Sequence, residues 1–455
     1  MTQQQLAQTV GVTLQAISKW ENGISEPSAS HLITLYKLFG DELFYEENGD
    51  KRQVIKKSMT SVREIFKIGR GPSSSHTIGP EIACKMLNRM YEGTDSYKVI
   101  LYGSLAKTGK GHRTDYVIKQ TLNCKNAEIV FDNITVTDHP NTMRFIVTRN
   151  GKIVGEHTVI SVGGGDIVFD GKAVQERETV YTHSSFSEIS QYCKEQGIAL
   201  WQYVYQNEKN IDEYLSVVWQ QMRFSIENGL QDEGVLPGGL NVNKKAKQLY
   251  ESEHIDETPE TRENRLICAY AFAVSEQNAS AQTIVTAPTC GAAGVLPAVL
   301  FYEQKKHNFS NEKIYRALAT AGVIGNIIKS NASISGAECG CQAEIGSACA
   351  MSAAALGELF DLSIDKIEYA AEIALEHHLG LTCDPVCGLV QIPCIERNAV
   401  AAMRAINAVN LASLLWQTRK ISFDNIVRTM KETGCDLPKP YKETAEGGLA
   451  KNYNQ

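Results

Sequence analysis

The chain is 455 residues long, and chains beyond about 250 to 300 residues divide into domains because a single hydrophobic core stops growing near that size. Its composition, 43% hydrophobic and 21% charged, is that of a soluble globular protein. A formal net charge of -7 argues against a large nucleic-acid surface, which needs clustered lysines and arginines. No stretch approaches the roughly 20 unbroken apolar residues of a membrane span, and no secretory signal opens the chain, so we expect a cytoplasmic protein without a membrane partner.

The first segment, residues 1–50, is predicted to be a short all-α head with a linker. Residues 2–23 predict two helices around a turn at Gly11, and a third helix is expected over 32–44. The pair resembles a Cro/repressor-type helix-turn-helix. Its second helix would then offer four side chains to the major groove of DNA, namely Thr13, Gln15, Ser18 and Lys19. The alternative is a helical hairpin used only for packing.

Residues 59–183 are predicted to form an α+β domain with an open sheet. Short alternating segments bounded by turn residues indicate its strands, which are KVILYG, EIVFD, ITVTD, RFIVTRNG and KIVGEHTVISVGGG. From Ser187 onward the pattern becomes helical and rich in alanine, notably at 314–329, 348–360 and 364–378. Such helices lack a wide polar face, so residues 187–455 should form a large all-α catalytic domain with buried helices in its centre. The fold class is therefore multidomain.

Two polar loops carry groups suited to proton transfer and anion binding. The decapeptide at 71–80, GPSSSHTIGP, places hydroxyls and free backbone N–H groups at a helix start, where a carboxylate would bind. His76 lies within it and could move a proton near physiological pH. A second loop, 103–115, contains His112. The alternative for each loop is a structural histidine.

Twelve cysteines in an intracellular chain indicate metal binding more than a disulfide framework, and six of them fall between Cys339 and Cys394. Cys341 stands just before an alanine-rich helix, and Cys383 and Cys394 stand in a loop between helices. Thiolates at helix starts are good ligands for soft metals, and three of them would leave one iron of a cubane cluster open to substrate. Zinc and buried structural cysteines remain the alternatives.

From about Met59 to the C-terminus the chain resembles iron-sulfur-dependent L-serine dehydratase. The motifs that carry the resemblance are GPSSSHTIGP, GSLAKTGKGHRTD, EGVLPGGL, TAPTCGAAGVLPAVL, KSNASISGAECGCQAEIGSACA, HHLGLTCDPVCGLVQIPCIERNAV and KETAEGGLA. The resemblance implies a 4Fe-4S cluster held by Cys341, Cys383 and Cys394. It implies dehydration of an amino acid, L-serine, to pyruvate and ammonia, and a homodimer.

The resemblance also implies roles for the polar residues. Substrate would be bound by Ser73, Ser74, Ser75 and Thr77. His76 is the first candidate for the base that removes the α-proton, and His112 is the second. Further candidates for catalysis or substrate binding next to Cys341 are Lys329, Asn331, Ser333 and Glu338. Three neighbouring thiols are not required as ligands, those of Cys339, Cys349 and Cys387.

Two departures from the family pattern bear on protection and specificity. Several members end in a cysteine that folds onto the open iron, whereas this chain ends KNYNQ. Cys290 stands where the family has a small amide, which leaves L-cysteine or another β-substituted amino acid as an alternative substrate. Two rival functions also stay open: a pyridoxal-phosphate dehydratase with a phosphate cradle at 162–167, and a DNA-binding regulator that senses serine.

Overall fold

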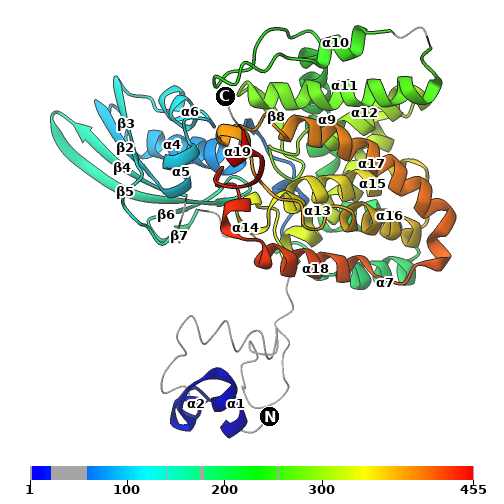
Figure 1. The fold of residues 1–455 in the computed structure, drawn as a ribbon, viewed down its shortest axis with the longest axis horizontal. Coiled ribbons are helices and arrows are strands. Elements are labelled where there is room, and N and C mark those ends of the chain that lie inside the picture. Colours follow the sequence, from blue (N-terminus) through cyan, green and yellow to red (C-terminus); the bar gives the residue numbers. More distant parts are fainter. Residues whose placement is uncertain (1–2, 22–58, 140, 175–178, 254–255, 454–455) are drawn as a thin grey trace. The chain divides into compact units, whose positions relative to one another are not determined.

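The computed structural model describes residues 3–21, 59–139, 141–174, 179–253 and 256–453 (Figure 1). The chain forms two compact units, Met1–Lys57 and Ser58–Gln455, which are considered separately.

The described part of the first unit consists of helices α1 (Gln3–Val10) and α2 (Leu14–Glu21). Gly11 makes the turn between them with a left-handed φ of 77°. The small core contains Ala7, Val10 and Ile17. This confirms the two predicted helices, whereas the predicted helix at 32–44 and the polar stretch after it lie outside the described residues.

In the second unit, a six-stranded sheet has the strand order β3-β2-β4-β5-β6-β7 (Figure 1). Its strands are β2 (Ser96–Tyr102), β3 (Asn126–Asp132), β4 (Thr142–Arg149), β5 (Lys152–Gly163), β6 (Asp166–Phe169) and β7 (Lys172–Ala173). The β2–β3 pair is parallel and the other pairs are antiparallel. One face packs against α4 (Gly79–Met90), α5 (Gly103–Thr108) and α6 (Thr114–Thr121). The alternation is visible in β2, where Val99 is buried and Lys98 is exposed.

One predicted strand is wrong. The segment ITVTD, residues 134–138, is a loop in which Ile134 is 91% and Val136 is 93% exposed. Asp132 Oδ1 accepts hydrogen bonds from the backbone N–H groups of Ile134 and Thr135, both at 2.9 Å. The aspartate thus satisfies the backbone locally in a turn, which competes with strand pairing despite the β-branched residues.

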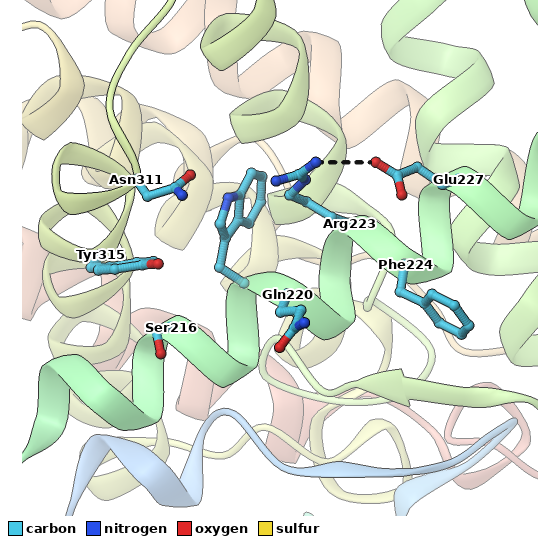
Figure 2. Close-up of a pocket in the computed structure, with 8 residues that line it drawn as sticks. Ser216, Gln220, Arg223, Phe224, Glu227, Asn311 and Tyr315 are labelled. Atoms are coloured by element: carbon cyan, nitrogen blue, oxygen red, sulfur yellow. Dashed lines mark hydrogen bonds and ion pairs between the residues drawn. The ribbon is translucent and has the colours of Figure 1, made fainter.

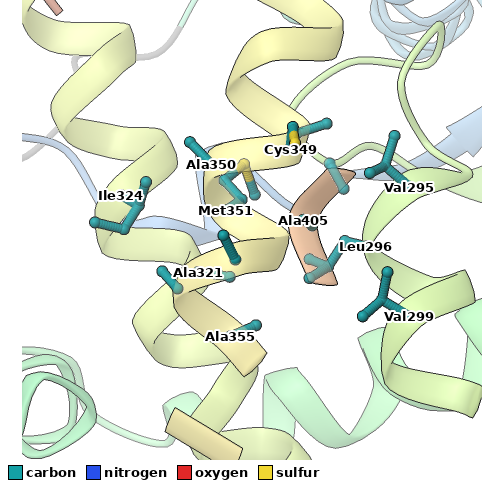
Figure 3. Packing of buried hydrophobic residues seen from close by; sticks show 14 of the residues in the cluster. Val295, Leu296, Val299, Ala321, Ile324, Cys349, Ala350, Met351, Ala355 and Ala405 are labelled. Carbon is teal, nitrogen blue, oxygen red and sulfur yellow. The ribbon is translucent and has the colours of Figure 1, made fainter. Parts of the chain in front are cut away.

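The rest of the second unit is helical. Its helices are α7 (Phe186–Gln196), α8 (Leu200–Asn207), α9 (Ile211–Gly229), α10 (Ala246–Glu251), α11 (Pro259–Ala279), α12 (Val295–His307), α13 (Asn311–Asn331), α14 (Gly336–Cys339), α15 (Ser347–Leu359), α16 (Ile364–Glu376), α17 (Cys394–Leu415), α18 (Phe423–Asp436) and α19 (Gly448–Asn452). Every residue of α15 is buried, and α12, α13 and α17 pack around it (Figure 3). Alanines such as Ala321, Ala350 and Ala405 stand at these contacts, and small side chains let helices approach closely. The predicted buried helices are confirmed.

A small second sheet connects the two regions of this unit. Strand β1 (Ile68–Arg70) pairs antiparallel with β8 (Thr283–Val285), and Gly69 stands opposite Ile284. The two strands come from distant parts of the sequence. Just after β8, the Thr286 hydroxyl donates to the Ile65 carbonyl at 2.7 Å and accepts from Lys67 N–H at 2.8 Å. Residues 58–455 therefore form one compact unit, and the division into domains at 183–187 stays a prediction.

Among the described residues, one segment, Cys394–Thr418, is long and apolar enough to cross a membrane by length and composition alone. The segment is not an unbroken apolar run, because it contains Glu396, Arg397 and Arg404. Most of the segment is α17, which packs against α11, α15 and α16 within the helical region. A central helix of a folded core passes the same test, so the segment is weak evidence for a membrane span.

Candidate active site

The serine-rich loop enters α4 through one wide helical turn, Ser74–Ile78. Gly71 packs so closely on α11 that a Cβ there would lie 2.1 Å from Asn278 Oδ1, and Asn278 Nδ2 donates to the Pro72 carbonyl at 3.1 Å. Thr77 Oγ1 lies 2.6 Å from the Ser73 carbonyl and 2.8 Å from the Arg70 carbonyl, so its hydroxyl holds the loop closed on itself. The loop conformation is therefore fixed from both sides.

The pairing of β1 with β8 brings this loop against the segment 286–291. Ser74 Oγ accepts a hydrogen bond from the backbone N–H of Cys290 at 3.1 Å and donates to Cys290 Sγ at 3.4 Å. The Cys290 side chain is buried, and burial raises the pKa of its thiol to about 12. Cys290 is thus a neutral thiol that fixes Ser74.

His76 and His112 stack with their ring centroids 4.3 Å apart. His76 has hydroxyl partners at both nitrogens, with Ser73 Oγ 3.3 Å from Nδ1 and Thr108 Oγ1 2.9 Å from Nε2. His112 Nδ1 lies 3.0 Å from the Thr108 carbonyl, which can only accept, so Nδ1 carries the proton. His112 Nε2 is then an acceptor, and no hydrogen-bond partner for it exists in the described part of the chain.

Burial is the main cause of the low basicity of both rings. It lowers the pKa of His112 to about 4 and, together with the neighbouring His112 ring, lowers the pKa of His76 well below its ordinary value. Both rings are therefore neutral near pH 7. A neutral His112 keeps the lone pair on Nε2 available for a proton.

Three buried thiols face the same small cavity as His112. Cys341 precedes the wide turn Gln342–Gly346 that leads into α15, and Cys394 is the first residue of α17. Cys383 stands in the preceding loop, where its backbone N–H donates to the Tyr441 carbonyl at 2.8 Å. The complete lining is Pro72, Ser73, His112, Gly291, Cys341, Glu344, Ile345, Cys383, Pro385, Val390, Cys394 and Glu443.

The electrostatic environment favours a thiolate at Cys341. A hydrogen bond from the Cys383 thiol, and then the Arg397 guanidinium, lower the pKa of Cys341 against the opposing effect of burial. Arg397 is itself held by Asp384 at 3.1 Å. The donor atoms of Cys341, Glu344 and Cys383 lie within 4.8 Å of one another, close enough to bind one metal ion.

The C-terminal segment forms the last side of the cavity. Glu443 N–H donates to the Cys383 carbonyl at 2.9 Å, and the Glu443 carboxylate lies within 4.8 Å of a ring nitrogen of both His76 and His112. Burial, then the charges of Glu344 and Cys341, raise the pKa of Glu443 to about 8. Two carboxylates therefore line the cavity, Glu344 towards the thiols and Glu443 towards the histidines.

Several residues that the sequence singled out meet at this cavity. The lining includes Ser73, His112, Cys341, Cys383 and Cys394. Behind it stand His76 and Ser74, and Ser75 lies half-buried in the same turn. Thr77 has the structural contacts described above.

Four other candidates are not among the lining residues. Lys329 Nζ lies 3.8 Å from Asp166 Oδ2, between α13 and the start of β6. Asn331 Nδ2 donates to the Ser184 carbonyl at 2.6 Å, and Ser333 Oγ donates to Glu338 Oε2 at 2.5 Å. These contacts hold the segment that leads towards Cys341.

The neighbouring cysteines have separate surroundings. Cys349 Sγ donates to the Ala401 carbonyl at 3.3 Å inside the helical core (Figure 3). Cys387 is exposed, and Cys339 packs against Gly434, where a Cβ would lie 2.5 Å from its sulfur. None of the three lines the cavity among the described residues.

Sequence reasoning did not identify Glu344, Arg397, Asn398 or Glu443 as site residues. Arg397 and Asn398 follow Cys394 by three and four positions, so they share its helix face, and this spacing was a usable signal. Asn398 Nδ2 donates to the carbonyls of Gly291 at 2.7 Å and Cys394 at 2.8 Å. For Glu443, no local pattern indicates that its segment returns to the cavity.

A second hollow lies on α9 beside the start of α13 (Figure 2). Its lining is Ser216, Trp219, Gln220, Arg223, Phe224, Glu227, Asn311 and Tyr315. Arg223 and Glu227 form an ion pair at 3.4 Å along α9 (Figure 2). The lining contains no thiol or imidazole, so the cavity at Cys341 is the candidate for catalysis.

The fold and site define an enzyme with a buried cavity in which three thiols face a histidine pair. Family profiles described as Serine dehydratase alpha chain and Serine dehydratase beta chain match residues 102–450 and 61–130, and one described as Helix-turn-helix matches residues 1–42. L-serine dehydratases 2 and 1 of Escherichia coli (strain K12) are 38% and 39% identical to this chain, over 86% of it and 98% and 99% of their own length. The L-serine dehydratase of Streptomyces coelicolor is 39% identical over 86% of this chain and 98% of its own. The chain therefore belongs to the serine dehydratase family and is a lyase.

Proposed function

We propose that this protein removes water and then ammonia from L-serine, at a 4Fe-4S cluster held by Cys341, Cys383 and Cys394. The observation that carries the proposal is the convergence of these three buried thiols on a cavity that His112, whose Nε2 has no hydrogen-bond partner among the described residues, also lines. Relatives named L-serine dehydratase match over nearly their whole length, which supports L-serine as the substrate.

The residues present fit such a cluster. Three thiols from separate segments line one cavity, and Arg397 places a positive charge beside the sulfur of Cys341, which favours its thiolate form. A fourth cysteine does not reach the lining within the described ranges, so three ligands would leave one metal position for substrate. When bound, the cluster would supply a Lewis-acid metal that assists departure of the substrate hydroxyl.

The chain's own groups would carry the proton transfers and binding. We assign removal of the α-proton to His112, because its Nε2 is an acceptor without a partner while both nitrogens of His76 already face hydroxyls. His76 would then orient His112 by stacking and through Thr108, which contacts both rings. This reverses the order expected from the sequence. Ser73 lines the cavity and would bind the substrate carboxylate. The aminoacrylate formed by loss of water becomes an imine and hydrolyses to pyruvate and ammonia.

The decisive experiment is anaerobic purification with iron and sulfide analysis and a pyruvate assay, for the wild type, Cys383→Ala and Cys387→Ala. We expect about four irons and four sulfides per chain in the wild type and in Cys387→Ala, whose thiol is exposed and outside the lining. Cys383→Ala should lose the cluster and the activity together. An iron-free wild type with activity retained in Cys383→Ala would refute the proposal and leave pyridoxal chemistry as the alternative.

The same assay with L-cysteine and L-threonine decides substrate preference. Cys290 lies against Ser74 and is not among the residues that line the cavity. Its side chain would therefore not contact the substrate, and its presence gives no reason to expect a preference for L-cysteine. We expect L-serine to give the highest kcat/KM. A higher value with L-cysteine would identify the alternative β-substituted substrate.

We also propose that the head binds DNA through α2. Thr13, Gln15 and Lys19 are exposed on α1–α2, Ser18 is half-buried, and the segment matches a helix-turn-helix profile. Binding of the full chain to its own upstream DNA should weaken in Gln15→Ala with Lys19→Ala. Equal retention by the double variant would exclude this surface. A cytoplasmic homodimer is the remaining expectation, and sedimentation of the holoenzyme tests its oligomeric state.

A further inference from the structure

Glu443 is held in the cavity by backbone contacts on both sides. Its N–H donates to the Cys383 carbonyl at 2.9 Å, and the Cys383 N–H donates to the Tyr441 carbonyl at 2.8 Å. Further along, Leu449 N–H donates to Asp384 Oδ2 at 2.8 Å. The C-terminal segment is thus fastened to the loop that carries Cys383.

The backbone of this segment is strained where it enters the site. Glu443 and Ala445 have φ values of 56° and 57°, in the left-handed region that costs a residue with a Cβ about 1 kcal/mol or more. Such conformations persist only where the surroundings impose them, and they are concentrated at functional sites. The strained segment places Glu443 in the lining of the cavity.

The carboxylate has no cationic partner within the described residues. The half-buried Glu443 side chain makes no ion pair there, although a carboxylate withdrawn from water is stable as an anion only beside a cation. Its oxygen lies within 4.8 Å of a ring nitrogen of His76 and of His112, with no direct hydrogen bond to either ring. That separation leaves room for an ammonium group that donates to the carboxylate at about 2.9 Å and lies beside the rings.

We infer that Glu443 binds the α-ammonium group of the amino-acid substrate. The bound ammonium group would place the α-carbon, one bond away, beside His112 Nε2. Glu344 is the other carboxylate in the lining, but its oxygen lies with the sulfurs of Cys341 and Cys383. Glu443 would therefore distinguish amino acids from hydroxy acids of the same shape. The inference rests on the proposed function, since it assigns the substrate amine to a part of that site.

Glu443→Gln tests this by removing the charge while keeping the size and one acceptor oxygen. The matched control is Glu446→Gln in the same segment, where Glu446 is exposed and pairs with Lys107 at 2.9 Å. Both variants are prepared as anaerobic holoenzyme, and cluster content is measured first. We then measure KM and kcat for L-serine, calorimetric binding of D-serine, and the inhibition constant of 3-hydroxypropanoate, which lacks the amine.

We expect Glu443→Gln to raise KM for L-serine and weaken D-serine binding by about 10- to 100-fold, the range for a lost charge-assisted hydrogen bond. The inhibition constant of 3-hydroxypropanoate should change less than about 3-fold, because that ligand makes no ammonium contact. Glu446→Gln should match the wild type. Equal weakening of both ligands, or unchanged D-serine binding with a full cluster, would overturn the inference.

Glu443→Asp keeps the charge and settles the case in which Glu443→Gln loses the cluster. With a full cluster, Glu443→Asp should still favour D-serine over 3-hydroxypropanoate. Equal affinity of Glu443→Asp for D-serine and 3-hydroxypropanoate would count against Glu443. Failure of the wild type to form pyruvate would instead refute the proposed function, so the two failures are distinguishable.

Discussion

The two walls of the cavity are built differently. The thiol wall, formed by Cys341, Cys383 and Cys394, stands where helices of the buried core begin or are joined. The histidine wall, formed by Ser73 and His112 with His76 behind them, stands on loops of the sheet region and has its own network through Thr108. Most polar atoms of the histidine network have hydrogen-bond partners within the protein. The three thiols, in contrast, are suited to bind a metal. The two walls should therefore respond differently to substitution.

The largest expected effect that separates the walls is on the histidine side. His112→Asn keeps an N–H group near the Thr108 carbonyl but removes Nε2, so kcat should fall by about 10²- to 10⁴-fold while the cluster is retained. His76→Asn should cost less, because both nitrogens of His76 already face hydroxyls. Anaerobic kinetics with iron analysis make the comparison. A larger loss in His76→Asn would restore His76 as the base, and loss of iron in either variant would show that the walls are coupled.

A smaller effect is expected just outside both walls. Ser333→Ala and Lys329→Met alter residues that do not line the cavity, and we expect KM for L-serine to change by less than about 3-fold in each. Steady-state kinetics at constant iron content test this boundary. A tenfold rise in KM in either variant would place that residue in contact with substrate and extend the site towards α13.

The smallest effect is expected away from the cavity, on the stability of the helical core around Glu358. Burial raises the pKa of Glu358 on α15 to about 7 against the hydrogen bond from Thr320 Oγ1 at 3.0 Å. In the unfolded chain this carboxyl ionises near its ordinary value, so it lowers stability as pH rises from about 4.5 to 7, and the full penalty remains above 7. Glu358→Gln should therefore stabilise the protein at pH 8 by about 1 to 2 kcal/mol and change little at pH 4.5.

Thermal unfolding of wild type and Glu358→Gln at the two pH values measures this difference. The unfolding temperature should rise by about 1 to 2 °C at pH 8, with kcat unchanged. Equal unfolding temperatures at pH 8 would mean that Thr320 and the surrounding helices already compensate the buried charge.

Much of the local structure followed from sequence patterns. Alanine-rich helices without a polar face are expected at the centre of the fold, and α15 is buried throughout. The failed strand at 134–138 has a local cause, since Asp132 captures the backbone N–H groups that a strand would have paired. The strand preference of the β-branched residues at 134–138 was not enough to overcome the hydrogen bonds of that turn.

The sequence by itself determined the residue types of the site and the local elements that carry them. The serine-rich loop had to precede a helix, and Cys341 and Cys394 had to stand at helix starts, because these features depend on near neighbours. Only the tertiary structure decided which groups face the cavity. The Thr108 carbonyl leaves Nε2 of His112 as an acceptor, and the link from Glu443 to Cys383 crosses 60 residues of chain. Such contacts arise from long-range packing, and no pattern of neighbouring residues contains them.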